Sequence, residues 1–148
     1  MIISKDLIFL GLDANDQRAA LKTLAERLLE KGLVREGFLD SLLQREAAYP
    51  TGLPTAVPVA LSHTDAQFVI RSALAVGVLQ RPVSFNEMGT PDREVMVEIV
   101  FLLAIDDPKA QVATLQRFSS LLKDPVALQT IRDAQDPAQC AAYLQKSL

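Results

Sequence analysis

The run EVMVEIVFLLAI at residues 94–105 constrains the fold of this chain more than any other feature. It is rich in β-branched residues, a composition that favours a buried strand. In an extended strand, one face carries Val95, Val97, Ile99, Phe101 and Leu103, and the other carries Met96, Val100 and Leu102. Both faces are apolar, so this strand is expected to lie centrally in a sheet with helices on each side. Glu98 is the exception, and we expect its carboxylate to be paired rather than catalytic.

Shorter strands and two helices are predicted in the first half of the chain. Residues 8–12, 57–61 and 73–79 are short and apolar, as expected of buried strands. Residues 15–32 and 35–48 carry leucines at helical spacing. The first helix is expected to end at its C-terminal glycine and the second before a proline, which disfavours helical backbone in the preceding residue.

The last third repeats one helix-starting device three times. Asp107-Pro108, Asp124-Pro125 and Asp136-Pro137 each combine a capping carboxylate with a proline that loses no hydrogen bond in the first turn. Each pair therefore predicts a helix. The sequence as a whole predicts an α/β protein: one domain over residues 1–148, built as a three-layer α/β/α sandwich on a mixed parallel and antiparallel sheet.

Composition excludes several classes of function. The chain has 148 residues and a net charge of −3, with scattered basic residues, which argues against a nucleic-acid surface. Cys140 stands alone, so no internal disulfide can form, and a cytoplasmic location is expected. One histidine and one cysteine cannot supply a structural zinc site, and no other metal or cofactor is expected. The N-terminal apolar stretch is interrupted by charges and is too short to span a bilayer.

His63 is the only histidine, and it follows the predicted strand at residues 57–61. A ligand site at the end of a strand is common in α/β proteins. The run SHTD does not form a catalytic triad, because adjacent residues of one strand point apart. Two roles remain open for the imidazole: general acid–base catalysis, or nucleophilic acceptance of a phosphoryl group. Ser62 and Thr64 are candidate donors to phosphate oxygens.

Arg45 is the candidate phosphate clamp. Phe38, Leu42, Arg45 and Tyr49 share one predicted helix stripe, which would place a guanidinium along a face directed at the core. A planar guanidinium binds phosphate in a bidentate manner. The alternative is an arginine that is ion-paired or extends to solvent at a helix end.

Residues 44–65, QREAAYPTGLPTAVPVALSHTD, resemble the signature of the enzyme IIA (EIIA) domains of the bacterial sugar phosphotransferase system (PTS), fructose–mannitol superfamily. The positions of that signature are matched by Arg45, Glu46, Thr51, Gly52, Ala60 and His63. The HTD run, the PTGL turn and RPVSFNEMG at residues 81–89 are most similar to the galactitol-type branch. The resemblance covers nearly the whole chain.

The resemblance implies a phosphocarrier. His63 would accept a phosphoryl group from the phosphocarrier protein HPr and pass it to a cysteine of a cognate EIIB, which serves a membrane EIIC during uptake of a galactitol-like sugar. Arg45 would stabilise the phosphate, and Ser62, Thr64 and Thr51 would bind it. Ser62 departs from the family's usual proline, and Lys109 stands where mannitol-type members carry a second histidine.

Both partners would dock on an exposed apolar ring around His63, with Leu53, Val57 and Phe85 as possible contributors. Cys140 is expected to be a packed thiol. A regulatory EIIA-like domain that senses phosphorylation and binds a partner protein is the main alternative. A small hydrolase using His63 as its base is a third, for which no activated nucleophile stands out.

Overall fold

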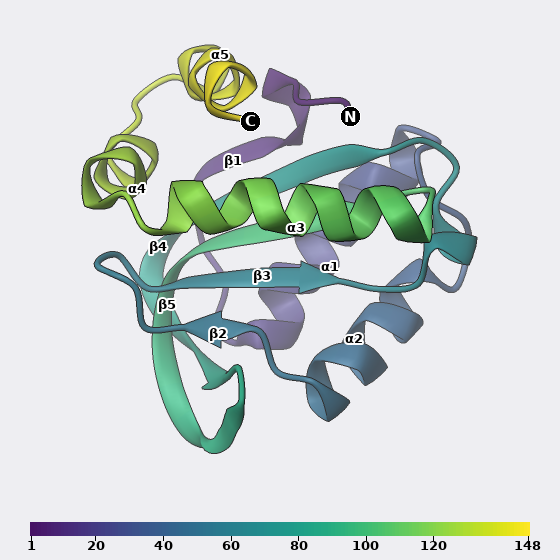
Figure 1. The fold of residues 1–148 in the computed structure, drawn as a ribbon, viewed down its shortest axis with the longest axis horizontal. Helices are drawn as coiled ribbons and strands as arrows, with labels where there is room; N and C mark the ends of the chain where they lie inside the picture. The colour runs from purple at the N-terminus through teal and green to yellow at the C-terminus, as the bar shows by residue number, and fades with distance from the viewer.

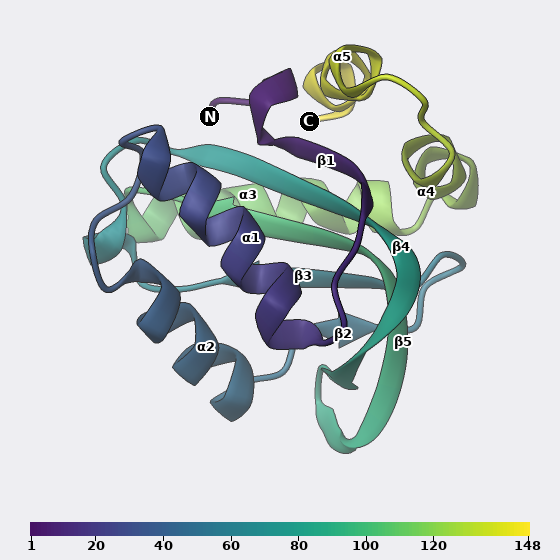
Figure 2. The ribbon, with the colours of Figure 1, turned by 180° about the vertical axis from the view of Figure 1, so that it is seen from behind.

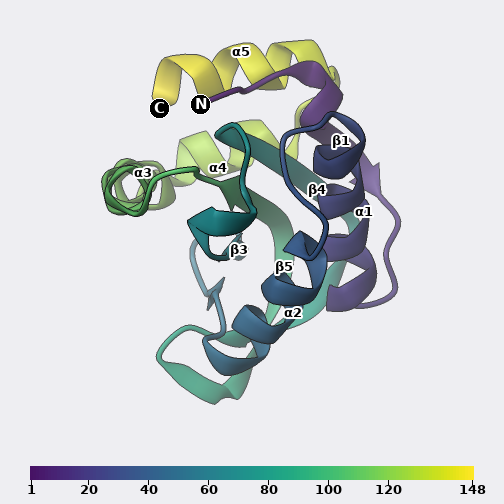
Figure 3. The ribbon, with the colours of Figure 1, turned by 90° about the vertical axis from the view of Figure 1, so that its right-hand side faces the viewer.

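The computed structural model describes all of residues 1–148, and it places five α-helices on the two faces of one mixed sheet (Figure 1). Seen from behind, α1 and α2 cover one face (Figure 2), and the edge-on view separates them from α3 by the sheet (Figure 3). The predicted three-layer arrangement is confirmed. The elements are η1 (Lys5–Leu7), β1 (Ile8–Leu12), α1 (Gln17–Glu30), α2 (Phe38–Ala48), β2 (Gly52–Leu53), β3 (Val59–His63), η2 (Ala66–Phe68), β4 (Ala73–Glu87), β5 (Thr90–Ala104), α3 (Pro108–Leu122), α4 (Pro125–Arg132) and α5 (Pro137–Ser147).

The sheet mixes parallel and antiparallel pairs, as the sequence predicts. β4 runs parallel to β1 and antiparallel to β5, and β3 runs parallel to β5 and antiparallel to β2. One further pair, Gly52 with Glu87, connects β2 to the far end of β4. The long β4–β5 hairpin therefore curls back onto the segment that leads into β3.

The three Asp-Pro pairs begin helices as predicted. Asp107, Asp124 and Asp136 each accept a backbone N–H of the following first turn, and each is followed by proline at the start of the helix. These contacts satisfy N–H groups that a helix start otherwise leaves unpaired. α3, α4 and α5 then cover the second face of the sheet.

Two apolar cores of similar size, with 23 and 20 buried residues, lie on the two faces of the sheet. The predicted division of β5 between these faces is wrong in its first half. Val95 and Val97 pack in the core under α1 and α2, whereas Ile99 packs in the core under α3 to α5. The backbone N–H groups of Glu98 and Ile99 both lie near the Pro58 carbonyl, at 2.8 and 3.4 Å. This bulge shifts the alternation by one residue.

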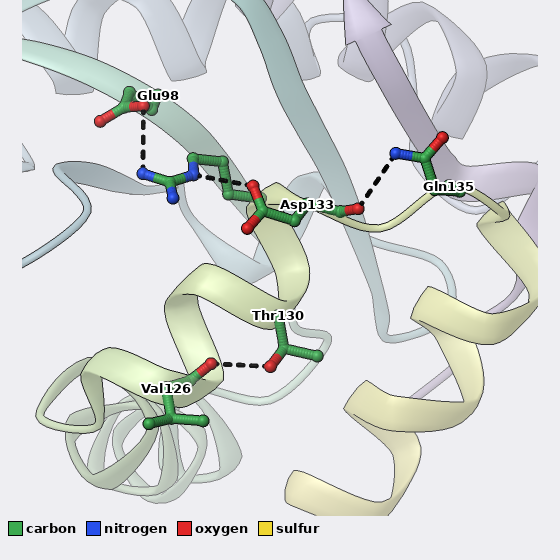
Figure 4. Close-up of polar contacts among 6 residues, drawn as sticks. Glu98, Val126, Thr130, Asp133 and Gln135 are labelled. Carbon is green, nitrogen blue, oxygen red and sulfur yellow. Dashed lines mark hydrogen bonds and ion pairs between the residues drawn. The ribbon is translucent and has the colours of Figure 1, made fainter.

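Glu98 lies at the bulge, and its carboxylate is paired as expected. Its Oε1 is 3.8 Å from Nη1 of Arg132, at the end of α4, and Arg132 also donates to Asp133 at 3.1 Å (Figure 4). The hydrogen bond to Asp133 raises the pKa of Arg132. Both side chains are about one-third exposed, so the pair contributes little to stability.

None of the five α-helices combines the length and the apolar character that crossing a bilayer requires.

Candidate active site

His63 is the last residue of β3, two residues beyond the end of the strand predicted at residues 57–61. It pairs with Leu103 of β5 in the parallel register, and its side chain is half-buried. The central strand β5 therefore supports the histidine backbone, while the strand end leaves part of the ring accessible.

The imidazole is oriented by its own strand. Nδ1 lies 3.0 Å from the carbonyl oxygen of Leu61, two residues earlier. A carbonyl only accepts hydrogen bonds, so this contact assigns the proton of the neutral ring to Nδ1. Nε2 has no hydrogen-bond partner within the protein. The neutral ring thus presents an unprotonated nitrogen, the form needed in a nucleophile.

Ser62 points to the other side of β3, where its hydroxyl belongs to a buried polar cluster around Glu46. Ser62 Oγ donates to Glu46 Oε1 at 2.9 Å, and Thr51 Oγ1 donates to the same oxygen at 2.7 Å. The Thr51 backbone N–H donates to Glu46 Oε2 at 2.7 Å. All three residues are at most 3% exposed. The hydroxyls of Thr51 and Ser62 therefore bond to the protein in this conformation.

The segment after His63 is held from three sides. The hydroxyls of Thr64 and Ser41 of α2 form a hydrogen bond, and Gln111 of α3 donates from Nε2 to the Thr64 carbonyl at 3.1 Å. Arg35 donates to the carbonyls of Gln67 and Val69. Thr64 itself is 3% exposed. Sequence reasoning missed Gln111, because a glutamine in the second turn of an amphipathic helix carries no signal of a contact with a strand end.

Arg45 does not face the core, and the predicted stripe is wrong beyond Leu42. Phe38 and Leu42 are buried, but the row continues through Glu46, four residues after Leu42. Arg45 is exposed, and its guanidinium carbon lies 4.7 Å from the centroid of the exposed Tyr49 ring. Its side chain forms no hydrogen bond or ion pair. The guanidinium is therefore free to bind an anion, on the same helix end as Glu46.

Lys109 lies in the first turn of α3 with an exposed side chain that makes no hydrogen bond or ion pair. Its backbone N–H completes the Asp107 cap at 3.1 Å. No group of three or more His, Cys, Asp or Glu side chains is positioned to hold a metal ion.

An apolar cavity of about 400 Å³ lies beside His63. Of the three residues predicted to surround the histidine, Leu53 lines this cavity, but Val57 and Phe85 are buried in the two cores. Val57 lies in the bend between β2 and β3 and packs in the core under α3 to α5, and Phe85 of β4 packs in the core under α1 and α2. The apolar lining consists of Leu53, Leu61, Met88, Leu115 and Leu122, and the polar lining of Thr55, His63, Ser119 and Lys123.

Cys140 is buried in α5, and burial raises the pKa of its thiol from 9.0 to about 11. The thiol is therefore protonated at neutral pH and is a packing group, as expected.

Comparison with known proteins identifies the family to which this chain belongs. The family model described as "Phosphoenolpyruvate-dependent sugar phosphotransferase system, EIIA 2" matches residues 1–147. The transcriptional regulator ManR of Bacillus subtilis is 31% identical over 115 residues, which are 78% of this chain but only 16% of ManR. The galactitol-specific EIIA component of Escherichia coli K12 is 26% identical over 122 residues, covering 82% of this chain and 81% of that protein.

The solved complex of enzyme IIA-mannitol and phosphorylated enzyme IIB-mannitol from Escherichia coli shares the fold. Its matching chain aligns with a TM-score of 0.76 at 21% identity, over 95% of each chain. The family match over residues 1–147 and the α/β fold agree. The chain belongs to the EIIA 2 family of the phosphoenolpyruvate-dependent sugar phosphotransferase system, whose members are phosphotransferase phosphocarriers.

Proposed function

We propose that His63 is the phosphoacceptor of this chain, receiving a phosphoryl group from phosphorylated HPr and passing it to a cysteine of a cognate EIIB. The observation that carries the proposal is the ring of His63 at the end of β3, with Nδ1 engaged by Leu61 and Nε2 unpartnered. The solved EIIA–EIIB complex of a structural relative supports the choice of acceptor.

Each transfer is a substitution at phosphorus. In the first, the Nε2 lone pair of His63 attacks the phosphorus carried by the donor, and the bond to the donor's ring nitrogen breaks with its electron pair. In the second, a thiolate of EIIB attacks the same phosphorus and the electron pair returns to Nε2. No other reactant is needed, so catalysis is mainly positioning and charge stabilisation.

Arg45 is the proposed clamp for the phosphoryl oxygens. Its guanidinium is exposed and engaged only with the Tyr49 ring, a contact that an anion can replace at small energetic cost. Direct phosphate binding by Thr51, Ser62 and Thr64 remains a prediction. In this conformation their hydroxyls are bonded to Glu46 or Ser41, so such a role requires those bonds to open.

The cavity beside His63 is the proposed docking site for HPr and EIIB. Leu53 and Leu122 form part of its wall, and Met88 is 43% exposed at the tip of the β4–β5 hairpin. A flexible thioether adapts to more than one partner, which suits a carrier that binds a donor and an acceptor in turn.

Residues 1–148 are proposed to act as one EIIA domain in the cytoplasm, serving a membrane EIIC through EIIB. Uptake of a galactitol-like sugar is the proposed pathway, supported by the 26% identity to the galactitol-specific component over most of both chains.

A regulatory role is the second candidate, and the match to ManR favours it. That regulator is 31% identical over 78% of this chain, although the chain spans only 16% of it. In this role phosphorylation of His63 would report the state of the system to a bound protein partner.

Phosphoryl relay in vitro tests the proposal. The untagged protein is incubated with phosphoenolpyruvate, enzyme I and HPr, and its mass is followed with and without acid treatment. We expect an acid-labile gain of one phosphoryl group that is lost in His63→Ala and kept in Thr23→Val, a control in α1. If the phosphoryl group leaves the protein when the cognate EIIB is added, the result supports a role in transport. If the protein keeps the phosphoryl group, the result supports the regulatory role. The absence of any gain contradicts both roles.

A further inference from the structure

We propose that the hydrogen bonds among Glu46, Thr51 and Ser62 fix the position of Arg45 relative to His63, so that Ser62 is a positioning residue for phosphoryl transfer. This inference rests on the proposed function of His63 and goes beyond it. It assigns a role to the buried serine that precedes His63.

The cluster connects the two elements that carry the proposed reacting groups. Glu46 follows Arg45 in the last turn of α2, and Ser62 precedes His63 at the end of β3. The 2.9 Å bond between Ser62 Oγ and Glu46 Oε1 is therefore a direct link between the helix end and the strand end. Alternation along β3 keeps Ser62 on the opposite side from the imidazole, so it acts through the backbone.

Thr51, in the segment between α2 and β3, also binds the Glu46 carboxylate. Its backbone N–H and its hydroxyl bind the two different oxygens of Glu46, both at 2.7 Å. Its own carbonyl accepts from the backbone N–H of Leu61 at 3.3 Å, next to Ser62. The carboxyl group is thereby held by the helix, the connecting segment and the strand together, and its rotation is restricted.

Burial restricts the Glu46 carboxylate to the one position in which these donors reach it. Glu46 is 3% exposed and has no cationic partner, so its oxygens depend on these three donors. Loss of the Ser62 hydroxyl leaves Oε1 with one donor and allows the carboxyl to shift. Such a shift would weaken the link between the helix end that carries Arg45 and the strand end that carries His63.

A double-mutant cycle separates positioning from direct phosphate contact. The variants are Ser62→Ala, Arg45→Ala and the double mutant, with Thr23→Val as the control for loss of a half-buried hydroxyl that bonds to the Ala19 carbonyl. The quantities measured are the maximal rate of His63 phosphorylation by phosphorylated HPr, the half-saturating HPr concentration and the melting temperature.

We expect Ser62→Ala to lower the maximal rate about tenfold, since small misplacements of reacting groups slow a positioned transfer. The half-saturating concentration should stay unchanged, because the docking cavity is intact. In the Arg45→Ala background the same substitution should change the rate less than about twofold. Thr23→Val should leave both kinetic quantities unchanged.

Three results overturn the proposal: an unchanged rate in Ser62→Ala, an equal loss in both backgrounds, or a change in half-saturation alone. The equal loss would instead indicate direct contact of Ser62 with phosphate. If Ser62→Ala is unfolded at the assay temperature, Glu46→Gln replaces it in the cycle, because it retains volume and removes one acceptor. Failure of the wild-type protein to be phosphorylated would reject the role of His63 itself, which is a distinct result.

Discussion

Nδ1 of His63 lies 3.0 Å from the carbonyl oxygen of Leu61, so the strand that presents the imidazole also fixes its tautomer. We predict that the neutral ring of the free protein is protonated at Nδ1. The single histidine gives one set of ring resonances in a ¹⁵N-edited NMR spectrum, and these should show the Nδ1–H form at alkaline pH. Dominance of the Nε2–H form contradicts this assignment.

Gly52 should not tolerate a side chain. An added Cβ would lie 2.6 Å from the backbone oxygen of Asn86, because β2 packs directly on the β4–β5 hairpin. We predict that Gly52→Ala lowers the free energy of unfolding by about 1–3 kcal/mol. Urea denaturation measures this loss.

Gly77→Ala is the matched control for that prediction. Its Cβ would meet Cδ2 of Leu12 at 2.9 Å, and the end of a leucine side chain can move where a backbone carbonyl cannot. We expect a smaller loss of stability than in Gly52→Ala. Equal losses of stability in the two variants would contradict the claim that the backbone oxygen of Asn86 excludes a side chain at Gly52.

Gln111 and Lys109 are predicted to differ in importance although both lie near the start of α3. Gln111→Ala removes the hydrogen bond to the Thr64 carbonyl, worth about 1 kcal/mol. We expect faster amide hydrogen exchange in residues 64–68 and slower phosphorylation of His63. Lys109→Ala removes no side-chain contact and should change neither quantity. A slower rate in Lys109→Ala would instead show that this lysine supplies charge to the phosphoryl group.

The Cys140 thiol should be unreactive in the folded protein. Burial raises its pKa to about 11, so the reactive thiolate is scarce at neutral pH. We predict that a thiol reagent labels Cys140 rapidly only in denaturant. The protonated thiol is favoured by the folded state, so this contribution to stability is complete below pH 9 and is lost as the pH rises through about 11. Rapid labelling under native conditions contradicts this prediction.

The sequence predicts the fold well wherever local chemistry determines it. The apolar run at residues 94–105 indicates the central strand, and the three Asp-Pro pairs begin α3, α4 and α5 as predicted. The bulge at Glu98 and Ile99 was not predictable, because it arises from the pairing of β5 with the Pro58 carbonyl, which no periodicity in the sequence reveals.

The candidate site was predicted in part. His63 lies at a strand end because turn-forming residues follow it, and that is visible in the sequence. The cluster around Glu46 is not visible in the sequence, because buried hydrogen bonds between α2 and β3 depend on how the helix packs. The spacing predicts a stripe through Arg45, whereas the buried row of α2 continues through Glu46. In the structure three donors make its burial favourable.

The most direct test of His63 as the phosphoacceptor is to measure which of its ring nitrogens becomes bonded to phosphorus. The protein, labelled with ¹⁵N at its single imidazole, is observed by NMR before and after addition of phosphoenolpyruvate, enzyme I and HPr. We predict that the Nε2 resonance shifts and acquires coupling to ³¹P, while Nδ1 keeps its proton and its bond to Leu61. An unchanged imidazole spectrum, or phosphorus coupled to Nδ1, would contradict the account.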